Sequence, residues 1–398
     1  MGMRVSRPRI SLQGTRLLPR RQVARRPPTI PASLLSERQD RVLQEPGGIA
    51  MRIIDAHQHV FPQYADLAVR AMDGAGVERV CTMEWHDGFG DTLKEHLRIF
   101  GQYPGRFTVF GNVDWSRINE PGFGKTAAEQ MERDVEAGMR GLKIFKALGL
   151  EYKHPNGEFW RLNDERLDPI WAKAGELGIP ILLHTADPSF FWMPVNEDNF
   201  WNGVLYGEYA WWTYYRKGYP SRDELLAERN EVIRRHPQTT FICPHVGSNS
   251  ESLDVAADDL DALPNLYYDI SARIPIMGLP GKHAQRSRAF LIEYQDRVLF
   301  GTDTIFDHTN VPTGIQAQSL YQPFEIPIGD ADPKEKYVET TIEFIQSHLD
   351  FLLTDKVQKN PPFKRTTKGY SIVGLNLPTE VAEKILYRNA ERLIPAER

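Results

Sequence analysis

The chain has 398 residues, of which 41% are hydrophobic, 25% charged and 11% aromatic, and its formal net charge at pH 7 is −5. This ordinary globular composition excludes low-complexity, collagen-like and small disulfide-stapled proteins. No apolar run approaches the roughly 18 residues that a membrane span needs, so we expect no membrane partner. The cysteines, Cys81 and Cys243, lie far apart in strand-like segments. They are typical of small buried side chains in a reducing compartment, and we expect a cytoplasmic protein.

The first fifty residues differ from the rest of the chain. They contain ten Arg, no Lys and three acidic residues, a charge of +7 that leaves −12 for the remainder. The segment is rich in Pro and has no sustained apolar period, so it cannot bury enough surface to offset its ordering entropy. We expect residues 1–50 to be a disordered tail or to precede a true start at Met51, with a mitochondrial transit peptide as a third interpretation. The acidic remainder predicts no nucleic-acid partner.

After Met51, short apolar runs alternate with charged segments of helical spacing. The runs are near-continuous in Val, Ile, Leu and Phe, which is typical of parallel strands buried on both faces. They cover residues 52–56, 77–83, 106–113, 139–145, 179–184, 238–244, 265–270 and 297–302. Eight such strand–helix units predict one α/β domain, residues 51–398, folded as a (β/α)8 TIM barrel. The alternative is a doubly wound open sheet, but no glycine-rich phosphate loop follows the first strand.

The charged segments between these runs predict helices. They cover residues 125–138, 164–178, 221–236 and 379–393. Ser221 followed by Glu224 is a capping box at the start of one helix.

Two insertions interrupt the alternation. Residues 186–220, after strand five, are rich in Trp, Tyr and Phe. In a barrel they would lie over the catalytic face, either as a packed lid or subunit contact or as an apolar wall for a planar substrate. Residues 304–375, after strand eight, contain a predicted helix at 334–354 and a predicted loop at 356–369.

Polar side chains stand at the ends of several predicted strands. The first strand ends in Asp55-Ala56-His57-Gln58-His59, and two His residues two apart on an extended chain point to the same side, where both can meet one ion. Neutral imidazole suits Zn²⁺ and similar divalent metals. His184, His245 and Asp303 follow strands five, six and eight. Because the C-terminal ends of barrel strands share one face, where active sites lie, these residues predict a metal centre.

These motifs resemble those of the amidohydrolase superfamily, in particular the amidohydrolase-related branch that contains enzymes like aminocarboxymuconate-semialdehyde decarboxylase. The resemblance covers residues 52–393 and is specific for the superfamily but poor for the substrate. It rests on the Asp-Ala-His-Gln-His start, Gly141-Leu142-Lys143-Ile144, His184, Pro244-His245-Val246-Gly247, Gly301-Thr302-Asp303 and the terminal Tyr387-Arg388-Asn389-Ala390-Glu391-Arg392-Leu393, in the family's order.

The resemblance implies a role for each residue. His57, His59 and His184 would bind one divalent metal ion, Zn²⁺ first and Mn²⁺ as the alternative. Asp303 would be a further ligand or the base beside the metal-bound water. His245 would hold or polarise that water or the substrate, or bind a second metal. The chemistry agrees, since a bound metal brings the pKa of water toward neutrality and a nearby carboxylate can take its proton.

Four further residues are weaker candidates. Lys143 resembles the strand-four lysine that binuclear relatives carboxylate to bridge two metals; otherwise it contacts substrate or pairs with an acid at the barrel rim. Arg273 could clamp a substrate carboxylate with two hydrogen bonds or form an ion pair with a neighbour such as Asp269. Trp85, at the end of strand two, could touch the substrate, and Asp55 could orient a ligand histidine or the loop.

The sequence therefore predicts a metal-dependent hydrolase that directs a metal-activated water at a small substrate with an amide, lactone or ester-like carbonyl. The alternative is a metal-dependent non-oxidative decarboxylase or other lyase acting on a small, for instance aromatic, carboxylic acid. A binding protein on an inactivated barrel is a third interpretation, which the presence of all five site residues disfavours. We expect a homodimer, since large aromatic insertions are often buried against a partner.

Overall fold

A computed structural model describes residues 51–83, 87–205, 212–307, 311, 332–359, 361 and 370–395. The chain divides into two units, Met1–Gly48 and Ile49–Arg398, and the described residues all belong to the second. The expectations for residues 1–50 and for Trp85 therefore fall outside the described residues.

Nine parallel strands form the central sheet, in the order β8-β7-β6-β5-β4-β3-β2-β1-β9. They are β1 (Ile54–Val60), β2 (Arg79–Met83), β3 (Phe107–Gly111), β4 (Gly141–Ile144), β5 (Ile181–Leu183), β6 (Phe241–Cys243), β7 (Leu266–Asp269), β8 (Val298–Leu299) and β9 (Thr304–Phe306). β8 pairs with β7, and β9 pairs with β1. Because β8 and β9 are two parts of one eighth strand, the sheet closes on itself. The predicted (β/α)8 barrel is confirmed.

The eighth strand corrects one predicted boundary. The sequence placed the strand at 297–302 and assigned Thr304 to the insertion, whereas the strand resumes as β9 at Thr304. Asp303 interrupts it with a left-handed backbone (φ +64°). Backbone hydrogen bonds from Ala56 to Phe300 (2.9 Å) and from Asp303 to His57 (2.8 Å) carry the pairing with β1 across the interruption. A left-handed residue inside a strand leaves no apolar pattern, so the sequence could not reveal it.

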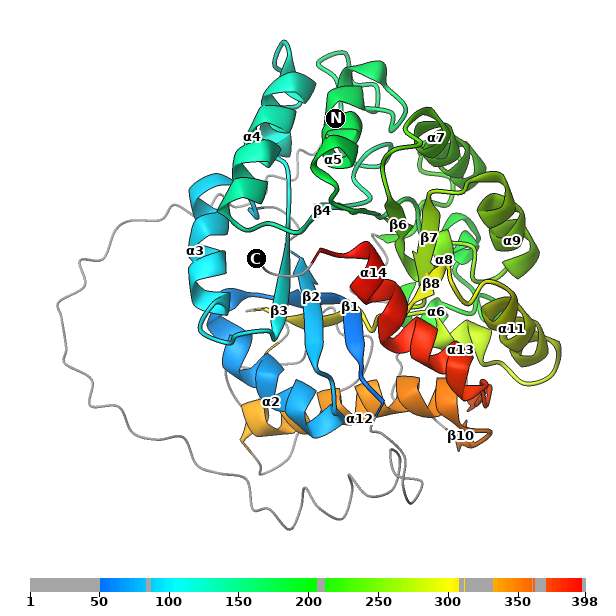
Figure 1. Ribbon diagram of the computed structural model, residues 1–398. Coiled ribbons are helices and arrows are strands. Elements are labelled where there is room, and N and C mark those ends of the chain that lie inside the picture. Colours follow the sequence, from blue (N-terminus) through cyan, green and yellow to red (C-terminus); the bar gives the residue numbers. More distant parts are fainter. Residues whose placement is uncertain are drawn as a thin grey trace. The chain divides into compact units, whose positions relative to one another are not determined.

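Helices surround the barrel on its outside (Figure 1). The helices that connect one barrel strand to the next are α2 (Ala65–Ala75), α3 (Gly90–Phe100), α4 (Phe123–Ala137), α5 (Asp168–Leu177), α7 (Arg222–Arg235), α9 (Leu253–Ala262) and α11 (Lys282–Glu293). At the start of α7 the Ser221 hydroxyl accepts from the Glu224 N–H (3.2 Å) and the Glu224 carboxylate accepts from the Ser221 N–H (2.7 Å), which confirms the capping box. The C-terminal helix runs through α13 (Thr379–Glu383), a π-helical turn (Lys384–Arg388) and α14 (Asn389–Leu393).

The strand layer separates two apolar cores. The inner core fills the barrel and contains Ile54, Ala56, Cys81, Met83, Phe110, Leu182, Ile242 and Leu299, together with Ala390 and Ile394 from the C-terminal helix and its end. The outer core lies between strands and helices and includes Val80, Phe107, Leu142, Ile181 and Phe241. Because both faces of each strand are buried, the strands appear in sequence as continuous apolar runs. α14 crosses the barrel end that faces the viewer in Figure 1.

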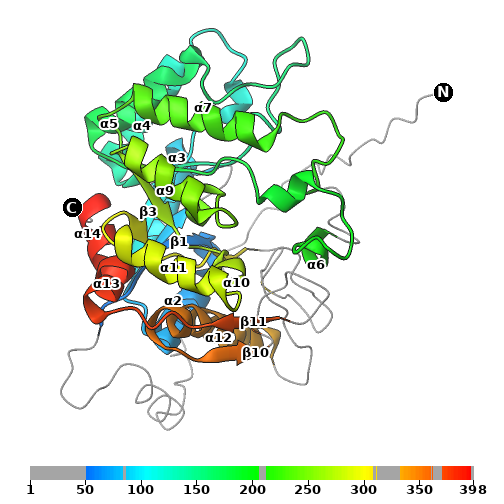
Figure 2. The same cartoon turned by 90° about the vertical axis from the view of Figure 1, so that its right-hand side faces the viewer.

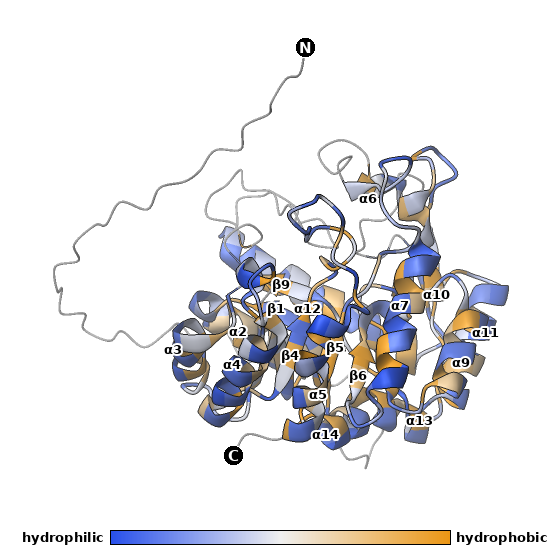
Figure 3. Ribbon diagram, turned by 90° about the horizontal axis from the view of Figure 1, so that it is seen from above, coloured by the Kyte–Doolittle hydropathy of each residue, from blue (hydrophilic) through white to orange (hydrophobic). Residues whose placement is uncertain are grey.

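Short elements extend the barrel at the opposite end. After β5 come a 3₁₀ turn (Ser189–Trp192) and α6 (Asn202–Leu205), and α6 and α14 lie at opposite ends of the barrel (Figure 3). α8 (Pro244–Gly247) and α10 (Ile274–Met277) are single turns after β6 and β7. Further 3₁₀ turns are Pro62–Tyr64, Trp115–Arg117 and Glu165–Leu167.

The second insertion contains α12 (Pro333–Leu353), close to the predicted helix, and an antiparallel hairpin of β10 (Val357–Lys359) and β11 (Ser371–Val373) beside it (Figure 2). The prediction of a loop at 356–369 is wrong for β10. Its side chains are largely exposed, so the sequence carries no apolar pattern there. The strand is stabilised by its backbone pairing and by the hydrogen bond from Gln358 Nε2 to the Ser347 carbonyl (2.9 Å). In the described part of the chain no helix combines the length and the apolar character that crossing a bilayer requires.

Candidate metal centre

A β-bulge turns two histidines of β1 into the barrel. The pairing of β1 with β2 shifts register between residues 55 and 58. Ile54, ahead of the shift, and Ala56, within it, pack in the inner core, whereas Val60, which would share their face in a regular strand, packs in the outer core. A bulge inserts one residue and reverses the faces beyond it. His57 and His59 therefore point inward, as a regular strand from Ala56 would not allow.

Asp55 holds this bulge in place. Its carboxylate accepts hydrogen bonds from the His57 N–H (3.1 Å), the Thr302 N–H (3.1 Å), the Thr302 hydroxyl (2.6 Å) and the Gln58 side-chain amide (2.7 Å). Burial raises the pKa of Asp55 to about 6, against these hydrogen bonds, which lower it. Asp55 thus fixes the backbone of β1 to the eighth strand and contacts the backbone of His57 rather than its ring.

Both histidine rings already use their Nδ1 atoms. His57 Nδ1 lies 2.9 Å from Asp269 Oδ2, and His59 Nδ1 lies 2.8 Å from the Met83 carbonyl oxygen. A carboxylate and a carbonyl only accept, so each Nδ1 carries the proton and donates it. The Nε2 atoms therefore present lone pairs, which lie 3.3 Å apart, and the Nζ of Lys143 lies 3.2 Å from that of His57.

Asp303 adds an oxygen to these two nitrogens. Its Oδ1 lies 3.4 Å from His57 Nε2 and 3.2 Å from His59 Nε2. None of these three atoms carries a proton, so no hydrogen bond can form among them. A tetrahedral ion with bonds of about 2.0–2.1 Å to its ligands holds the ligand atoms about 3.3–3.4 Å apart. The donor set and its spacing therefore fit a divalent metal ion.

His245 and His184 lie beside this trio. His245 Nδ1 lies 2.9 Å from the Ser271 carbonyl oxygen, and its Nε2 lies 4.0 Å from Asp303 Oδ2. The His184 ring stands edge-on to His245, with ring centroids 4.6 Å apart, and its Nε2 is buried without a hydrogen-bond partner. The structure thus brings His57, His59 and Asp303 together within 4.8 Å, and places His184 next to them but outside that set.

Lys143 lies inside the barrel. Its side chain is 1% exposed, and its Nζ lies 3.2 Å from His57 Nε2. Burial lowers the pKa of Lys143 to about 8, which Asp303 and Asp269 partly oppose. Among the described residues it forms no ion pair, so it is not the acid-paired rim lysine that one interpretation of the sequence allowed.

Burial disfavours the charged forms of His59, His184 and His245, and the histidines around Asp303 favour its ionised form. Burial lowers the pKa of His59 to about 4 and holds the pKa values of His184 and His245 well below the ordinary range. Burial alone would raise the pKa of Asp303, but His57, His59 and His245 hold it well below its usual value. Neutral nitrogen ligands beside one carboxylate are the forms that a divalent ion requires.

Strained backbone gathers at this end of the barrel. Left-handed conformations occur at Ala186 (φ +59°), His245 (φ +62°), Ala272 (φ +54°) and Asp303 (φ +64°), each within a few residues of a different strand end. Such a conformation costs a non-glycine residue about 1–2 kcal/mol, and it concentrates at functional sites. At Gly301 the requirement is space and not backbone conformation, since a Cβ there would lie 3.0 Å from the His57 Cβ.

Two further buried cations lie near the histidines. Arg273 is 5% exposed, its Nη1 donates to the Ala272 carbonyl (3.1 Å), and its guanidinium lies 5.2 Å from the Trp201 ring centroid. It forms no ion pair with Asp269, one of the alternatives that the sequence left open. Lys146 pairs with Asp187, a residue that sequence reasoning missed.

Asp187 also connects the aromatic insertion to the barrel. Its Oδ2 accepts from the Tyr214 hydroxyl (2.8 Å) and the Trp212 indole N–H (3.2 Å), and Lys146 Nζ lies 4.2 Å from the Trp212 ring centroid. The position of Asp187, four residues past the end of β5, was the available sequence signal.

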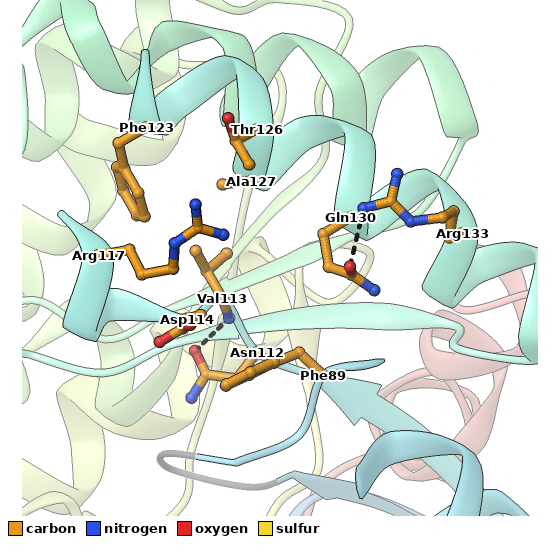
Figure 4. A pocket seen from close by; sticks show the side chains of 10 residues that line it. All are labelled: Phe89, Asn112, Val113, Asp114, Arg117, Phe123, Thr126, Ala127, Gln130 and Arg133. Atoms are coloured by element: carbon orange, nitrogen blue, oxygen red, sulfur yellow. Dashed lines mark hydrogen bonds between the residues drawn. The ribbon is translucent and has the colours of Figure 1, made fainter. Parts of the chain in front are cut away.

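A separate small cavity of about 130 Å³ lies outside the barrel, between the end of β3 and α4 (Figure 4). Phe89, Asn112, Val113, Asp114, Arg117, Phe123, Thr126, Ala127, Gln130 and Arg133 line it. None of the metal-centre residues contributes to this lining, and Arg117 is paired with Glu120.

A family model described as Amidohydrolase matches residues 54–396, which include every histidine and acid of the centre. Among curated proteins, none matches the sequence.

Several solved structures are similar. An uncharacterised TIM-barrel protein from Bordetella bronchiseptica is 18% identical, with 86% of this chain and 98% of that chain covered and a TM-score of 0.48. A 4-oxalomesaconate hydratase from Rhodopseudomonas palustris is 14% identical, with 86% and 96% covered and a TM-score of 0.45. A manganese-bound dihydroxybenzoic acid decarboxylase from Polaromonas sp. JS666 is 16% identical, with 64% and 86% covered and a TM-score of 0.40.

Proposed function

Because the chain belongs to the amidohydrolase family, we propose that it is a metal-dependent hydrolase acting on an amide, lactone or ester bond of a small molecule. The observation that carries this proposal is the convergence of proton-free His57 Nε2, His59 Nε2 and ionised Asp303 Oδ1 within 3.2–3.4 Å. These three residues would hold the ion, and His184, with its unpartnered Nε2, would complete the set. Zn²⁺ suits two or three imidazoles and one carboxylate, with Mn²⁺ as the alternative.

A bound divalent ion would bring the pKa of a water toward neutrality and polarise a carbonyl oxygen. Asp303 then accepts the proton of the attacking water and returns it to the leaving nitrogen or oxygen. Its low pKa keeps it ionised at neutral pH, ready to accept.

For His245 we propose one of the roles that the resemblance implied. Its Nδ1 donates to the Ser271 carbonyl, so its Nε2, on the side of Asp303, can only accept. Its pKa well below the ordinary range keeps this form at neutral pH. His245 therefore orients the attacking water by accepting a hydrogen bond, and it does not donate to the substrate carbonyl.

A lyase reaction, the release of carbon dioxide from a small carboxylic acid, is the second candidate. The buried Arg273 favours it, because a guanidinium can hold an acid substrate through a carboxylate. The same metal ligands serve both reactions, so product analysis has to separate them.

The test is a reaction in H₂¹⁸O with the zinc- or manganese-loaded protein and a panel of lactones, amides, esters and aromatic carboxylic acids. A hydrolase incorporates ¹⁸O into the product acid. If a substrate instead releases carbon dioxide and its remaining product carries no ¹⁸O, hydrolysis is contradicted. Chelation and His57→Ala should each abolish turnover. His283→Ala, on the exposed surface of α11, is the matched control and should keep it.

A further inference from the structure

We propose that Arg229 and Arg222, two arginines of α7, are positioning residues that hold His245 in its place beside the metal centre. They do not touch the reacting atoms themselves and act through the backbone turn that carries His245. This inference rests on the proposed function, in which His245 orients the attacking water.

His245 lies in a turn of left-handed backbone that follows β6. The residues in this conformation are His245 (φ +62°), Val246 (φ +56°), Gly247 (φ +58°) and Ser248 (φ +62°). Successive left-handed residues are rare, because each non-glycine Cβ crowds the backbone, and a β-branched residue such as Val246 is crowded most. Such a turn persists only where its surroundings enforce it.

Side chains complete the hydrogen bonding of this turn. Within its backbone, the Ser248 N–H donates to the His245 carbonyl (3.1 Å) and the Asn249 N–H donates to the Val246 carbonyl (2.9 Å). The carbonyls of Gly247 and Ser248 accept hydrogen bonds from side chains. Because a buried carbonyl without a hydrogen bond is costly, these side chains decide whether the left-handed turn is stable.

The donors to these two carbonyls are arginines of α7 that lie two helical turns apart, on one face of the helix. Arg229 Nη1 donates to the Gly247 carbonyl (2.6 Å). Arg222 Nη2 donates to the Ser248 carbonyl and to Asn249 Oδ1 (2.6 Å). Glycine permits the close approach of Arg229, because a Cβ at Gly247 would lie 2.9 Å from its Nη1.

Arg229 is itself held from the outer side of the barrel. It is fully buried, and its Nη2 pairs with Asp259 Oδ2 (2.7 Å) on α9, the helix beside α7 (Figure 2). Its Nε also donates to Asn230 Oδ1 (3.0 Å). A buried ion pair adds little net stability, because loss of hydration offsets the attraction. What this pair provides is a guanidinium fixed in one place against the Gly247 carbonyl.

The inner side of the turn is joined to the strand ends around the metal centre. The His245 N–H donates to Asp269 Oδ1 (2.9 Å), and His245 Nδ1 lies 2.9 Å from the Ser271 carbonyl oxygen. The Ser248 hydroxyl donates to the carbonyl of Thr185 (2.8 Å), just after β5. The turn therefore connects α7 with the ends of β5 and β7. If its outer carbonyls lose their partners, its backbone has to change to satisfy them, and the His245 ring moves with it.

Lysine variants remove the hold and keep the charge. An ammonium lacks the planar fork with which each arginine reaches two acceptors. A misplacement of about 1 Å can cost about 10²-fold in rate. We therefore expect kcat to fall about 10- to 100-fold in Arg229→Lys, and by less in Arg222→Lys, because Arg222 is only half-buried. KM should stay within about twofold, since substrate binding is not affected, and the metal content should not change.

The place of His245 can be measured without a substrate. Long-range ¹H–¹⁵N correlation spectra of the full-length, zinc-equilibrated protein with ¹⁵N-labelled histidine show which ring nitrogen carries the proton. The His245 signals are identified by their loss in His245→Gln. The unchanged protein should show a single form with the proton on Nδ1, which donates to the Ser271 carbonyl. Both lysine variants should also show the form protonated on Nε2.

Arg297→Lys is the matched control. Arg297 also donates to backbone carbonyls, those of Leu263 (2.6 Å) and Leu266 (2.8 Å), but at the start of β7, the end of that strand away from the metal centre. This variant should keep the single His245 form, kcat and KM. An unchanged His245 form or an unchanged kcat in Arg229→Lys, or an equal effect in Arg297→Lys, would overturn the proposal. If Arg229→Lys does not fold, Arg222→Lys decides the matter.

The outcomes separate this inference from the proposed function. If no lactone, amide or ester is hydrolysed and the His245 spectrum still changes in Arg229→Lys, the function fails and the hold of α7 on His245 stands. If hydrolysis depends on the metal and Arg229→Lys keeps both the spectrum and kcat, the function stands and the positioning role fails.

Discussion

The Nε2 atoms of His57 and His59 lie 3.3 Å apart, and neither has a proton to offer the other, because both rings donate through Nδ1. Asp303 brings a third lone pair to the same place. A cation relieves the repulsion among these groups and binds the folded chain alone, so it stabilises that state. We expect Zn²⁺ at about a hundred times its dissociation constant to add about 2.7 kcal/mol to the free energy of unfolding. Urea unfolding with and without zinc measures this change in the free energy of unfolding. An unfolding midpoint that zinc leaves unchanged would contradict the metal centre.

Asp303→Asn should reduce turnover more than metal content. The amide keeps an oxygen near both Nε2 atoms but cannot take a proton, so we expect a loss of about 10²- to 10⁴-fold in kcat. Steady-state kinetics and metal analysis of the same sample provide the comparison. Asp296→Asn, which changes an exposed acid paired with Lys384, is the control. Loss of the metal from Asp303→Asn would make Asp303 chiefly a ligand.

Lys143→Met should leave the metal bound. The Lys143 ammonium lies 3.2 Å from His57 Nε2, and its positive charge opposes a cation at that nitrogen. We therefore expect the variant to bind zinc as tightly as the unchanged protein or more tightly, with about one ion per chain in both. Competition with a zinc-sensitive dye gives both affinities. Two ions in the unchanged protein and fewer in the variant would instead indicate a carboxylated, bridging lysine.

The chelated protein should lose stability on acidification. The pKa of His59 is about 4 in the folded chain, below its ordinary value of 6.5, so the unfolded chain binds more protons between these values. The stabilisation is complete above about pH 6.5 and declines as the pH falls toward 4. Between about pH 7.5 and pH 5, His59 should account for about 2 kcal/mol. Urea unfolding of the unchanged protein and His59→Gln at both pH values isolates this contribution, and identical pH dependence in the two would contradict it.

Lys146→Met should destabilise the fold by leaving the Asp187 carboxylate buried without its cation. Removing one partner of a buried ion pair costs about 3–5 kcal/mol, and the hydrogen bonds from Tyr214 and Trp212 to Asp187 place the expected loss at the lower end. The double variant Lys146→Met/Asp187→Leu should recover most of it. Thermal unfolding of the three proteins is the measurement, and a single variant as stable as the unchanged protein would contradict the pairing.

The barrel could be predicted from the sequence because its strands are buried on both faces. Apolar runs then mark each strand, and the parallel arrangement brings His184, His245 and Asp303 to one end without knowledge of any distance. β10 escaped prediction because backbone pairing at an exposed edge leaves no apolar pattern.

The contacts within the centre could not be predicted in the same way. A bulge in β1 decides that His57 and His59 face inward, and a left-handed Asp303 decides that its carboxylate meets them. Both features depend on Asp55 and Gly301, which act through tertiary contacts between the first and eighth strands. The pairing of Lys146 with Asp187, and the lack of one for Arg273, likewise depend on where the loops fold.

The metal content of the purified protein, measured by plasma mass spectrometry, tests the central claim most directly. Three proteins are compared: the unchanged chain, His57→Ala, and His283→Ala as a surface control. We predict about one divalent ion per chain in the unchanged protein and in His283→Ala, and loss of that ion from His57→Ala. An unchanged protein that holds no ion after incubation with zinc or manganese, or a His57→Ala protein with its full complement, would contradict the metal centre.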